Sequence, residues 1–181
     1  MSFSGTYWIT FGIGVACLGF FLYQYNRFTR NRIKRREALH NIDLFLKRQS
    51  ELLNQFGDLL RRLELPVPPE IESARQASAR AYQTSPIPGK AGHLKAADQQ
   101  YYRLIRQANQ YPQAQRRPDF SHLLEALEKN ASELQGARRY HNALVRDYNI
   151  RVETMPSALA ALTLRFKKTD FLTDSNATPA P

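Results

Sequence analysis

The chain has 181 residues, and 26 Lys and Arg stand against 16 Asp and Glu, which gives a formal net charge of +10. A single cysteine excludes a disulfide framework and a multi-cysteine zinc site. With only 8 glycines and few β-branched runs, the composition argues against a β-sandwich and a Rossmann sheet.

The N-terminal segment has the length and composition of a membrane-spanning helix. Residues 1–26 carry no charge, and the 19 residues Tyr7–Tyr25 would span about 28 Å as a helix, close to the hydrocarbon thickness of a bilayer. Aromatic residues lie at both ends, as they do at membrane interfaces. The segment lacks the basic start and the small residues of a cleaved signal peptide. We predict a transmembrane helix with a short external N-terminus, and Cys17 as an apolar residue of the span.

A basic collar follows the span directly. It contains six basic residues and no acidic one: Arg27, Arg30, Arg32, Lys34, Arg35 and Arg36. Positive residues beside a span stay on the cytoplasmic side, so we predict that the N-terminus faces out and that the chain after Arg27 faces in. Because the collar carries six of the ten net charges, nucleic acid is not expected as a partner. We predict that the collar binds the anionic headgroups of the lipid bilayer.

A long soluble helix is predicted next. From Leu39 to Leu63, apolar residues recur every three or four positions, and neighbouring apolar residues widen the stripe beyond a two-stranded seam. The pattern ends at Leu65, before a proline-rich stretch that cannot continue a helix. No helix-breaking residue lies between Tyr7 and this end, so the span and the soluble helix can be continuous.

Two shorter helices are predicted in the middle of the chain. The first starts at Pro69 or Glu70, because the first turn of a helix tolerates proline, and it runs to Tyr82. Two prolines and two glycines predict a loop over residues 84–92. The next helix is predicted over residues 92–110, followed by a polar loop.

A second long helix is predicted from Asp119, a favourable N-cap residue, to Met155. A short apolar segment over residues 157–171 is expected to pack as a cap on the helices. The polar residues 172–181 have nothing to bury, and we predict that they are disordered.

Together these elements predict an all-α fold: a single N-terminal transmembrane helix followed by an elongated antiparallel four-helix bundle. The predicted segments are the external N-terminus and span (1–26), the basic collar (27–36), the bundle (37–171) and the tail (172–181).

The sequence shows no pattern of an active site or a metal site. No two of its four histidines lie three or four residues apart on one predicted helix, and no carboxylate–histidine spacing resembles a di-iron bundle. There is no glycine-rich phosphate loop and no nucleophile motif. We expect that the protein is not an enzyme and uses no cofactor and no metal ion.

Polar residues interrupt the apolar stripes of the two long helices. Gln49 lies on the first stripe, and Arg138 and His141 lie on the second. They either set the register of the bundle or line a polar groove that binds a partner. Because a buried charge needs an acceptor, we predict that Arg138 pairs with Asp43 or Glu51 of the first soluble helix.

Two stretches resemble the LemA family: residues 41–56 (NIDLFLKRQSELLNQF) and residues 111–171, which include ARRYHNALVRDYN and a Met-Pro pair. The resemblance covers most of the chain. It implies a single N-terminal helix in the bacterial cytoplasmic (inner) membrane, a short external N-terminus and a cytoplasmic antiparallel bundle, and it implies no reaction. Three polar residues that match the family join the candidate polar site: Asn142, Tyr148 and Asn149.

The family pattern has an arginine at the position of Gln49 and a glutamate at that of Ala131. Both charges are absent here, so we predict that the two positions face each other across the long helices and that no charge is left unpaired. The alternative is that the two positions changed independently on a half-exposed face.

Two functions fit these features. The first is a membrane-anchored, non-catalytic interaction or scaffold module of the LemA type, whose partner is an unidentified membrane or cytoplasmic protein, or a second copy of the chain. The second is a ligand-binding or sensory module. Its polar site would lie between helices and use Gln49, Arg138, His141, Asn142, Tyr148 and Asn149.

Overall fold

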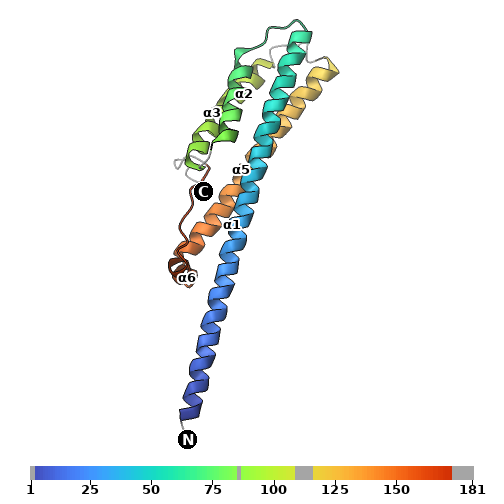
Figure 1. Cartoon of the computed structure of the whole chain (residues 1–181). Helices are drawn as coiled ribbons and strands as arrows, with labels where there is room; N and C mark the ends of the chain where they lie inside the picture. Colours follow the sequence, from blue (N-terminus) through green and yellow to red (C-terminus); the bar gives the residue numbers. More distant parts are fainter. Residues whose placement is uncertain (1–2, 85–86, 109–115, 173–181) are drawn as a thin grey trace, which may run out of the picture. The chain divides into compact units, whose positions relative to one another are not determined.

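The computed structural model describes residues 3–84, 87–108 and 116–172. These ranges hold α-helices and no β-strand, which confirms the all-α prediction (Figure 1). The helices, in chain order, are α1 (Phe3–Arg62), α2 (Pro69–Gln83), α3 (Ile87–Ala108), α5 (Pro118–Glu153) and α6 (Ser157–Thr163).

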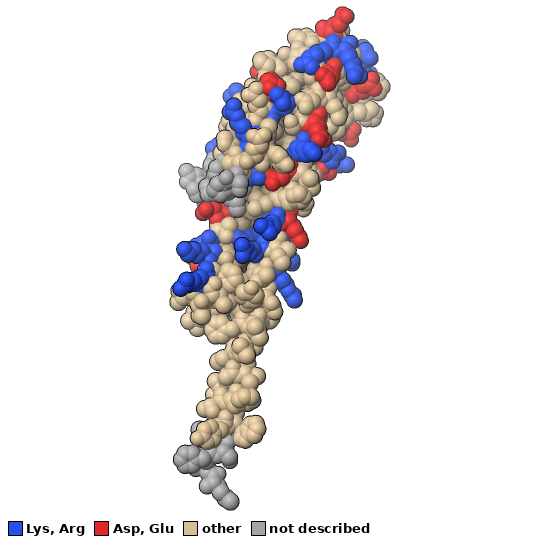
Figure 2. Space-filling model, in the orientation of Figure 1, with Lys and Arg blue, Asp and Glu red and all other residues tan. Residues whose placement is uncertain are grey.

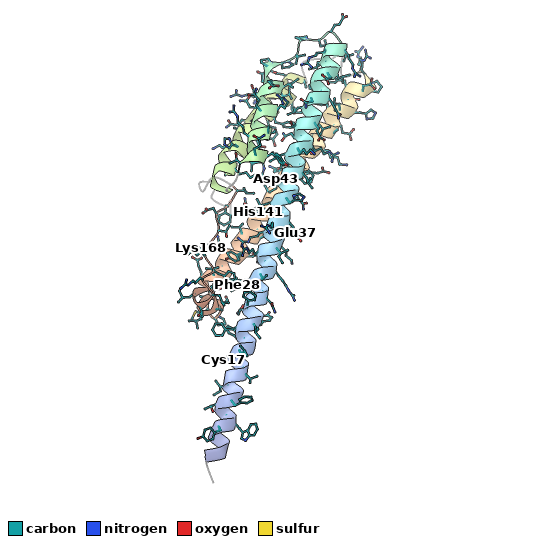
Figure 3. All side chains as sticks on the ribbon, in the orientation of Figure 1. Cys17, Phe28, Glu37, Asp43, His141 and Lys168 are labelled. Atoms are coloured by element: carbon teal, nitrogen blue, oxygen red, sulfur yellow. The ribbon has the colours of Figure 1, made fainter. Side chains whose placement is uncertain are left out.

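The first helix, α1, has no break between Phe3 and Arg62, so the apolar N-terminal stretch and the first soluble helix belong to one helix. Among the described helices, α1 is the one long and apolar enough to cross a membrane. Only 6% of its most apolar window is buried, whereas the core helix of a soluble protein would be mostly buried. Cys17, labelled in Figure 3, is exposed on this part of α1.

The end of α1 is a Schellman motif. Glu64 has a left-handed backbone with a φ of 55°, and the Leu65 N–H donates to the Leu60 carbonyl over 3.0 Å. Leu65 also packs against the cluster that contains Leu60, as is common for this motif. The helix therefore ends at Arg62, slightly before the predicted end at Leu65.

The structure corrects the predicted start of α3. The helix α2 begins at Pro69, as predicted, but α3 begins at Ile87, so the loop predicted over residues 84–92 is wrong from residue 87 onward. Pro88 falls in the first turn of α3, where a helix does not need the missing N–H, so proline did not exclude a helix there. The predicted end of this helix and most of the polar loop after it fall on residues 109–115, outside the described residues.

The structure also moves the start of α5. Because the helix begins at Pro118, Asp119 lies in its first turn and is not the N-cap residue. A carboxylate in the first turn still interacts favourably with the helix dipole. The helix ends at Glu153, two residues before the predicted Met155. The predicted cap segment contains α6.

The chain divides into two compact units, which we call unit 1 and unit 2. Unit 1 contains residues 1–36 and 143–169, and unit 2 contains residues 37–142 and 170–181. The segment predicted as one bundle, 37–171, is thus divided, because its residues 143–169 group with the N-terminal part of α1.

Unit 2 has two hydrophobic clusters, which are mostly aliphatic. The larger one joins α1, α2, α3 and α5, and Phe56 of α1 lies 5.3 Å from Phe120 of α5 between ring centroids. The Asn130 side chain of α5 donates to the Phe45 carbonyl of α1. The later residue of α1 thus contacts the earlier residue of α5, and the earlier residue of α1 contacts the later one. The two helices are therefore antiparallel in this unit. The smaller cluster includes Leu172, a residue that we assigned to the tail, although it is buried.

Unit 1 has a small core of a different kind. Phe28, Tyr148 and Ala161 are buried together, with Val152 and Phe166 packed against them. Three of the five are aromatic, and they bring α1, α5 and the segment around α6 into one cluster. Because Phe28 belongs to residues 27–36, this cluster determines which other segments of the chain lie beside the basic collar.

Candidate functional site

The basic collar lies on α1 within unit 1, and its residues do not all behave alike. Five side chains are exposed, and one, Arg35, is half-buried. The Arg35 guanidinium lies 3.9 Å from the centroid of the Tyr148 ring and donates a hydrogen bond to the Thr169 hydroxyl. Burial lowers the pKa of Arg35. Arg35 therefore contributes to the packing of unit 1, and the five exposed side chains remain available to bind an external partner.

The aromatic rings beside the collar fix where α6 lies. Phe28 stacks on Phe166 with 4.8 Å between ring centroids and meets Tyr148 edge to face at 5.9 Å. Tyr25 lies 6.5 Å from Phe166. Because Tyr25 closes the apolar stretch of α1, the end of α6 lies beside the end of that stretch. Figure 3 labels Phe28 on the side of α1 that faces α6.

Sequence analysis missed this contact because the apolar stripe of α1 is interrupted by polar residues. In the structure the stripe starts well before Leu39, and its covered positions continue in steps of three and four through the collar: Gln24, Phe28, Asn31, Arg35, Ala38 and Ile42. Phe28 stood in a charged run and was not singled out. A periodicity scan that accepts polar residues on the stripe would have found it.

The predicted polar residues of unit 1 hold the backbone of the segment after α6. The Tyr148 hydroxyl donates to the Lys167 carbonyl over 2.9 Å. The Asn149 amide forms two bonds with Thr169: its Nδ2 donates to the carbonyl over 2.9 Å, and its Oδ1 accepts from the N–H over 3.0 Å. These side chains thus fasten residues 167–169 to α5.

Asn142 does the same in unit 2, where its Oδ1 accepts from the Leu172 N–H over 2.9 Å. His141 is fully buried on α5, as its stripe position predicts. Gln49 is buried too, and its Oε1 accepts a weak bond of 3.4 Å from the Ser78 hydroxyl of α2.

The acceptor predicted for Arg138 is wrong. Arg138 forms a two-bond ion pair with Asp98 of α3, one bond being 2.8 Å long, and Asp43 pairs with Lys90 of the same helix. The spacing of the apolar residues predicted the face of α5 on which Arg138 lies, but it did not indicate that α3 would pack against that face.

Positions 49 and 131 were predicted to face each other, but they lie at different levels along the two long helices. The bond from Asn130 to the Phe45 carbonyl puts Ala131 near the level of Phe45, about one helical turn from Gln49. The bonded partner of Gln49 is Ser78. These contacts are local: those of Tyr148 and Asn149 lie within unit 1, and those of Gln49, Arg138 and Asn142 lie within unit 2.

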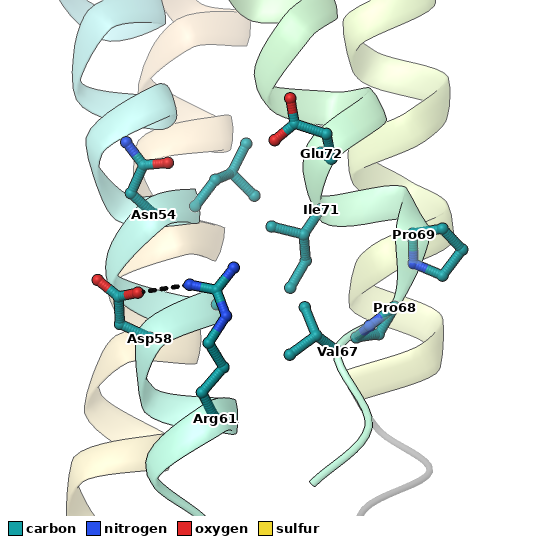
Figure 4. Close-up of a pocket in the computed structure, with 10 residues that line it drawn as sticks. Asn54, Asp58, Arg61, Val67, Pro68, Pro69, Ile71 and Glu72 are labelled. Atoms are coloured by element: carbon teal, nitrogen blue, oxygen red, sulfur yellow. Dashed lines mark hydrogen bonds and ion pairs between the residues drawn. The ribbon is translucent and has the colours of Figure 1, made fainter.

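A groove lies elsewhere in unit 2, between the end of α1 and the start of α2 (Figure 4). It has a volume of about 410 Å³, and Asp58 and Arg61 form a 2.8 Å ion pair on its rim. Hydrogen bonds from Arg75 and Gln76 lower the pKa of Glu72, which also lines the groove, to about 2. None of the six predicted polar residues is among the described residues that line it.

The charge of the chain is concentrated in unit 1. That unit has 11 Lys and Arg against 2 Asp and Glu, a net charge of +9, which leaves +1 for unit 2. Five of the basic residues come from residues 143–169, more than 100 positions from the collar. Figure 2 shows the apolar end of α1 free of charged side chains and a zone rich in Lys and Arg directly beyond it. Among the described residues, no cluster of three or more His, Cys, Asp or Glu could hold a metal ion.

The comparisons with known proteins identify the family. No curated protein matches the chain significantly. The model of the LemA family matches residues 38–181, which is most of the chain and begins two residues after the collar. This match covers the stretches whose residues resembled the family in the sequence. The chain belongs to the LemA family.

Proposed function

We propose that the protein is a non-catalytic interaction or scaffold module that α1 anchors in the bacterial cytoplasmic membrane. The observation that carries the proposal is the exposed apolar stretch Tyr7–Tyr25, followed at once by the five exposed basic residues of the collar. An exposed apolar helix of this length is unstable in water and stable in a bilayer. The collar would bind anionic headgroups on the cytoplasmic side.

In this proposal the N-terminus lies outside the cell, and α1, α2, α3 and α5 form an antiparallel four-helix bundle in the cytoplasm. The antiparallel contacts of α1 with α5 support this arrangement. Three features tie α3 and α2 to the long helices: the pairs Asp98–Arg138, Lys90–Asp43 and Ser78–Gln49.

The anchor can be tested with the one native thiol. In spheroplasts and in inverted membrane vesicles, Cys17 should resist a membrane-impermeant maleimide, and the chain should remain in membranes washed with alkaline carbonate. A second chain carries Cys17→Ser and Ser132→Cys, which places the thiol on an exposed position of α5. This thiol should react only in inverted vesicles. If the thiol at position 132 reacts in intact spheroplasts, or if carbonate releases the chain from the membranes, the proposal is overturned.

The interaction role needs a partner surface, and among its described residues unit 2 exposes three tyrosines: Tyr82, Tyr102 and Tyr140. Exposed tyrosines are typical of binding hot spots. Crosslinking of the full chain in native membranes should recover one partner protein. Replacement of one of these tyrosines by serine should abolish that recovery. The control is Gln135→Ser, an exposed change on the same helix as Tyr140. Recovery of a small molecule and no protein would favour the sensory alternative.

The sensory alternative has less support, because its candidate residues are engaged with other parts of the chain. Asn142, Tyr148 and Asn149 bind backbone groups of residues 167–172, and Arg138 is paired with Asp98. A ligand in such a site would have to replace these contacts.

A further inference from the structure

The short helix α6 exposes apolar side chains that its own unit does not cover. Ala160 and Ala161 are buried, and Ala161 belongs to the core of unit 1. On the opposite face, Leu159 is 51% exposed and Leu162 is 79% exposed, and Met155 just before the helix is 68% exposed. Leucines three positions apart lie on one side of a helix, so they form a single apolar face.

The position of this apolar face along α1 is fixed by rings. Phe166 lies three residues after the end of α6 and packs against Phe28 and Tyr25, at 4.8 Å and 6.5 Å between ring centroids. Tyr25 is the last residue of the apolar stretch of α1. If α1 spans the bilayer, as we proposed above, α6 lies at the depth where the span leaves the hydrocarbon and enters the headgroup region.

The charge around α6 complements an anionic surface. Arg165 and Lys167 are exposed just after the helix, and Lys168 pairs with Glu153. Unit 1 as a whole has 11 basic residues against 2 acidic ones. An apolar helix face flanked by Lys and Arg is typical of a segment that lies in the membrane interface.

We propose that α6 is a second membrane contact, in which Met155, Leu159 and Leu162 enter the headgroup–acyl boundary of the leaflet that α1 leaves, while Arg165 and Lys167 bind anionic headgroups. The proposal rests on the anchor proposed above. The occupant is an anionic lipid leaflet, because the apolar face adjoins the proposed span and the surrounding charge is positive. The contact would hold unit 1 against the membrane at two points.

The test uses full-length chains, each with one cysteine labelled by an environment-sensitive fluorophore. One chain keeps Cys17. Two others carry Cys17→Ser with Leu159→Cys or Leu162→Cys. The matched control carries Cys17→Ser with Leu44→Cys, because Leu44 is an exposed leucine of unit 2 with the same 51% exposure as Leu159. All are reconstituted into preformed vesicles of phosphatidylethanolamine and phosphatidylglycerol.

The labels at positions 159 and 162 should show blue-shifted emission, several-fold weaker quenching by iodide than the label at 44, and quenching by lipids that carry a spin label near the headgroup. In vesicles of phosphatidylcholine alone, and in chains that also carry Arg165→Gln and Lys167→Gln, this protection should decrease. The label at Cys17 should be quenched by deeply placed spin labels in every case.

The outcomes separate the two proposals. If the label at Cys17 is deep and those at 159 and 162 are as open to iodide as the label at 44, the contact of α6 is wrong and the anchor stands. If the label at Cys17 is open to iodide, the anchor itself fails. If positions 159 and 162 are protected only in native membranes and not in the vesicles, a protein covers them and the lipid contact is overturned.

Discussion

Unit 1 and unit 2 use different means to hold helices together. Unit 2 has two larger, mostly aliphatic clusters, with the ion pairs Lys90–Asp43 and Arg138–Asp98 between helices, and a net charge of +1. Unit 1 has a small aromatic core and a net charge of +9. Like charges repel, and this repulsion destabilises a small unit, so unit 1 depends on its few rings. The difference fits a unit whose excess charge is neutralised by something outside the protein, which our proposal identifies as anionic lipid.

The largest expected effect comes from removing the central ring of unit 1. Phe28→Ala should destabilise unit 1 by about 3–5 kcal/mol, because the change empties space between Phe166 and Tyr148. Hydrogen exchange in the reconstituted chain should show faster exchange of the amides in residues 157–169. Ile33→Ala, at a 52% exposed residue of the same collar, is the control and should leave exchange unchanged. Equal exchange in both variants would mean that the rings do not hold α6.

In unit 2, the corresponding weak point is an ion pair and not a ring. Lys90 has a side chain only 8% exposed, and Asp43 is its partner. Asp43→Asn should cost about 2–3 kcal/mol in the free energy of unfolding, because it removes the counter-charge of a buried ammonium group. Adding Lys90→Met should recover most of the loss, as a double-mutant cycle by urea unfolding would show.

The control for this pair is the exposed ion pair Asp58–Arg61, whose side chains are 61% and 69% exposed. Asp58→Asn should change stability by less than about 0.5 kcal/mol. If the two aspartate variants lose the same stability, burial does not distinguish the pairs, and the contrast between the units weakens.

The sequence predicted the helices well because helical periodicity is a local property. The stripe from Leu39 to Leu63 and the proline-rich turn after it were enough to place the soluble part of α1 and the start of α2. The same rule failed in the collar, since polar Asn31 and Arg35 occupy stripe positions there and hid the role of Phe28. At Pro88 the prediction was a loop where the structure has a helix, because a proline in the first turn of a helix has the same local pattern as a proline in a loop.

Partners between helices could not be read from the sequence, because periodicity fixes a face and not the neighbour on it. Arg138 was correctly placed on the buried stripe of α5, yet its acceptor is Asp98 of α3 and not a residue of α1. Asn142, Tyr148 and Asn149 were singled out as a candidate ligand site, and they bind backbone groups of residues 167–172. Such bonds depend on where a later segment without regular structure runs, which no local pattern records.

A buried hydroxyl offers a pH test that should affect unit 2 alone. Tyr101 is 2% exposed, its hydroxyl has no hydrogen-bond partner among the described residues, and burial, with the nearby Glu128 charge, raises its pKa. Above the ordinary tyrosine pKa of about 10, the unfolded chain loses this proton while the folded chain keeps it, so stability should fall as pH rises.

Tyr101→Phe should therefore flatten the alkaline decline in stability of unit 2. At neutral pH, it should leave stability equal or raise it by about 1 kcal/mol, because it removes an unpaired buried oxygen. The measurement is urea unfolding between pH 8 and pH 11. Tyr102→Phe, at a 51% exposed residue next in the chain, is the control and should keep the decline. An unchanged decline in Tyr101→Phe would mean that another group causes it.

The smallest effect on stability is expected from substitutions at two helix ends that share the same backbone motif. In unit 2 the α1 Schellman motif has Glu64 at the left-handed position, and in unit 1 the α6 motif has Arg165, with φ values of 55° and 57°. In the α6 motif the Phe166 N–H donates to the Ala161 carbonyl over 2.9 Å. Glycine is the residue that adopts this backbone without strain, so a glycine at either position should stabilise its unit.

The two gains should differ because the side chains differ in charge. Glu64 places a negative charge at the negative end of a helix, whereas Arg165 places a positive one there. Glu64→Gly should therefore gain about 1 kcal/mol, and Arg165→Gly about 0.5 kcal/mol or less. Glu64→Ala and Arg165→Ala keep the strained backbone and report the effect of charge alone. Thermal unfolding should rank Glu64→Gly first, and anionic vesicles should cancel the gain of Arg165→Gly, because the arginine side chain then also binds headgroups. If Arg165→Gly gains as much in anionic vesicles as in neutral ones, Arg165 does not touch lipid.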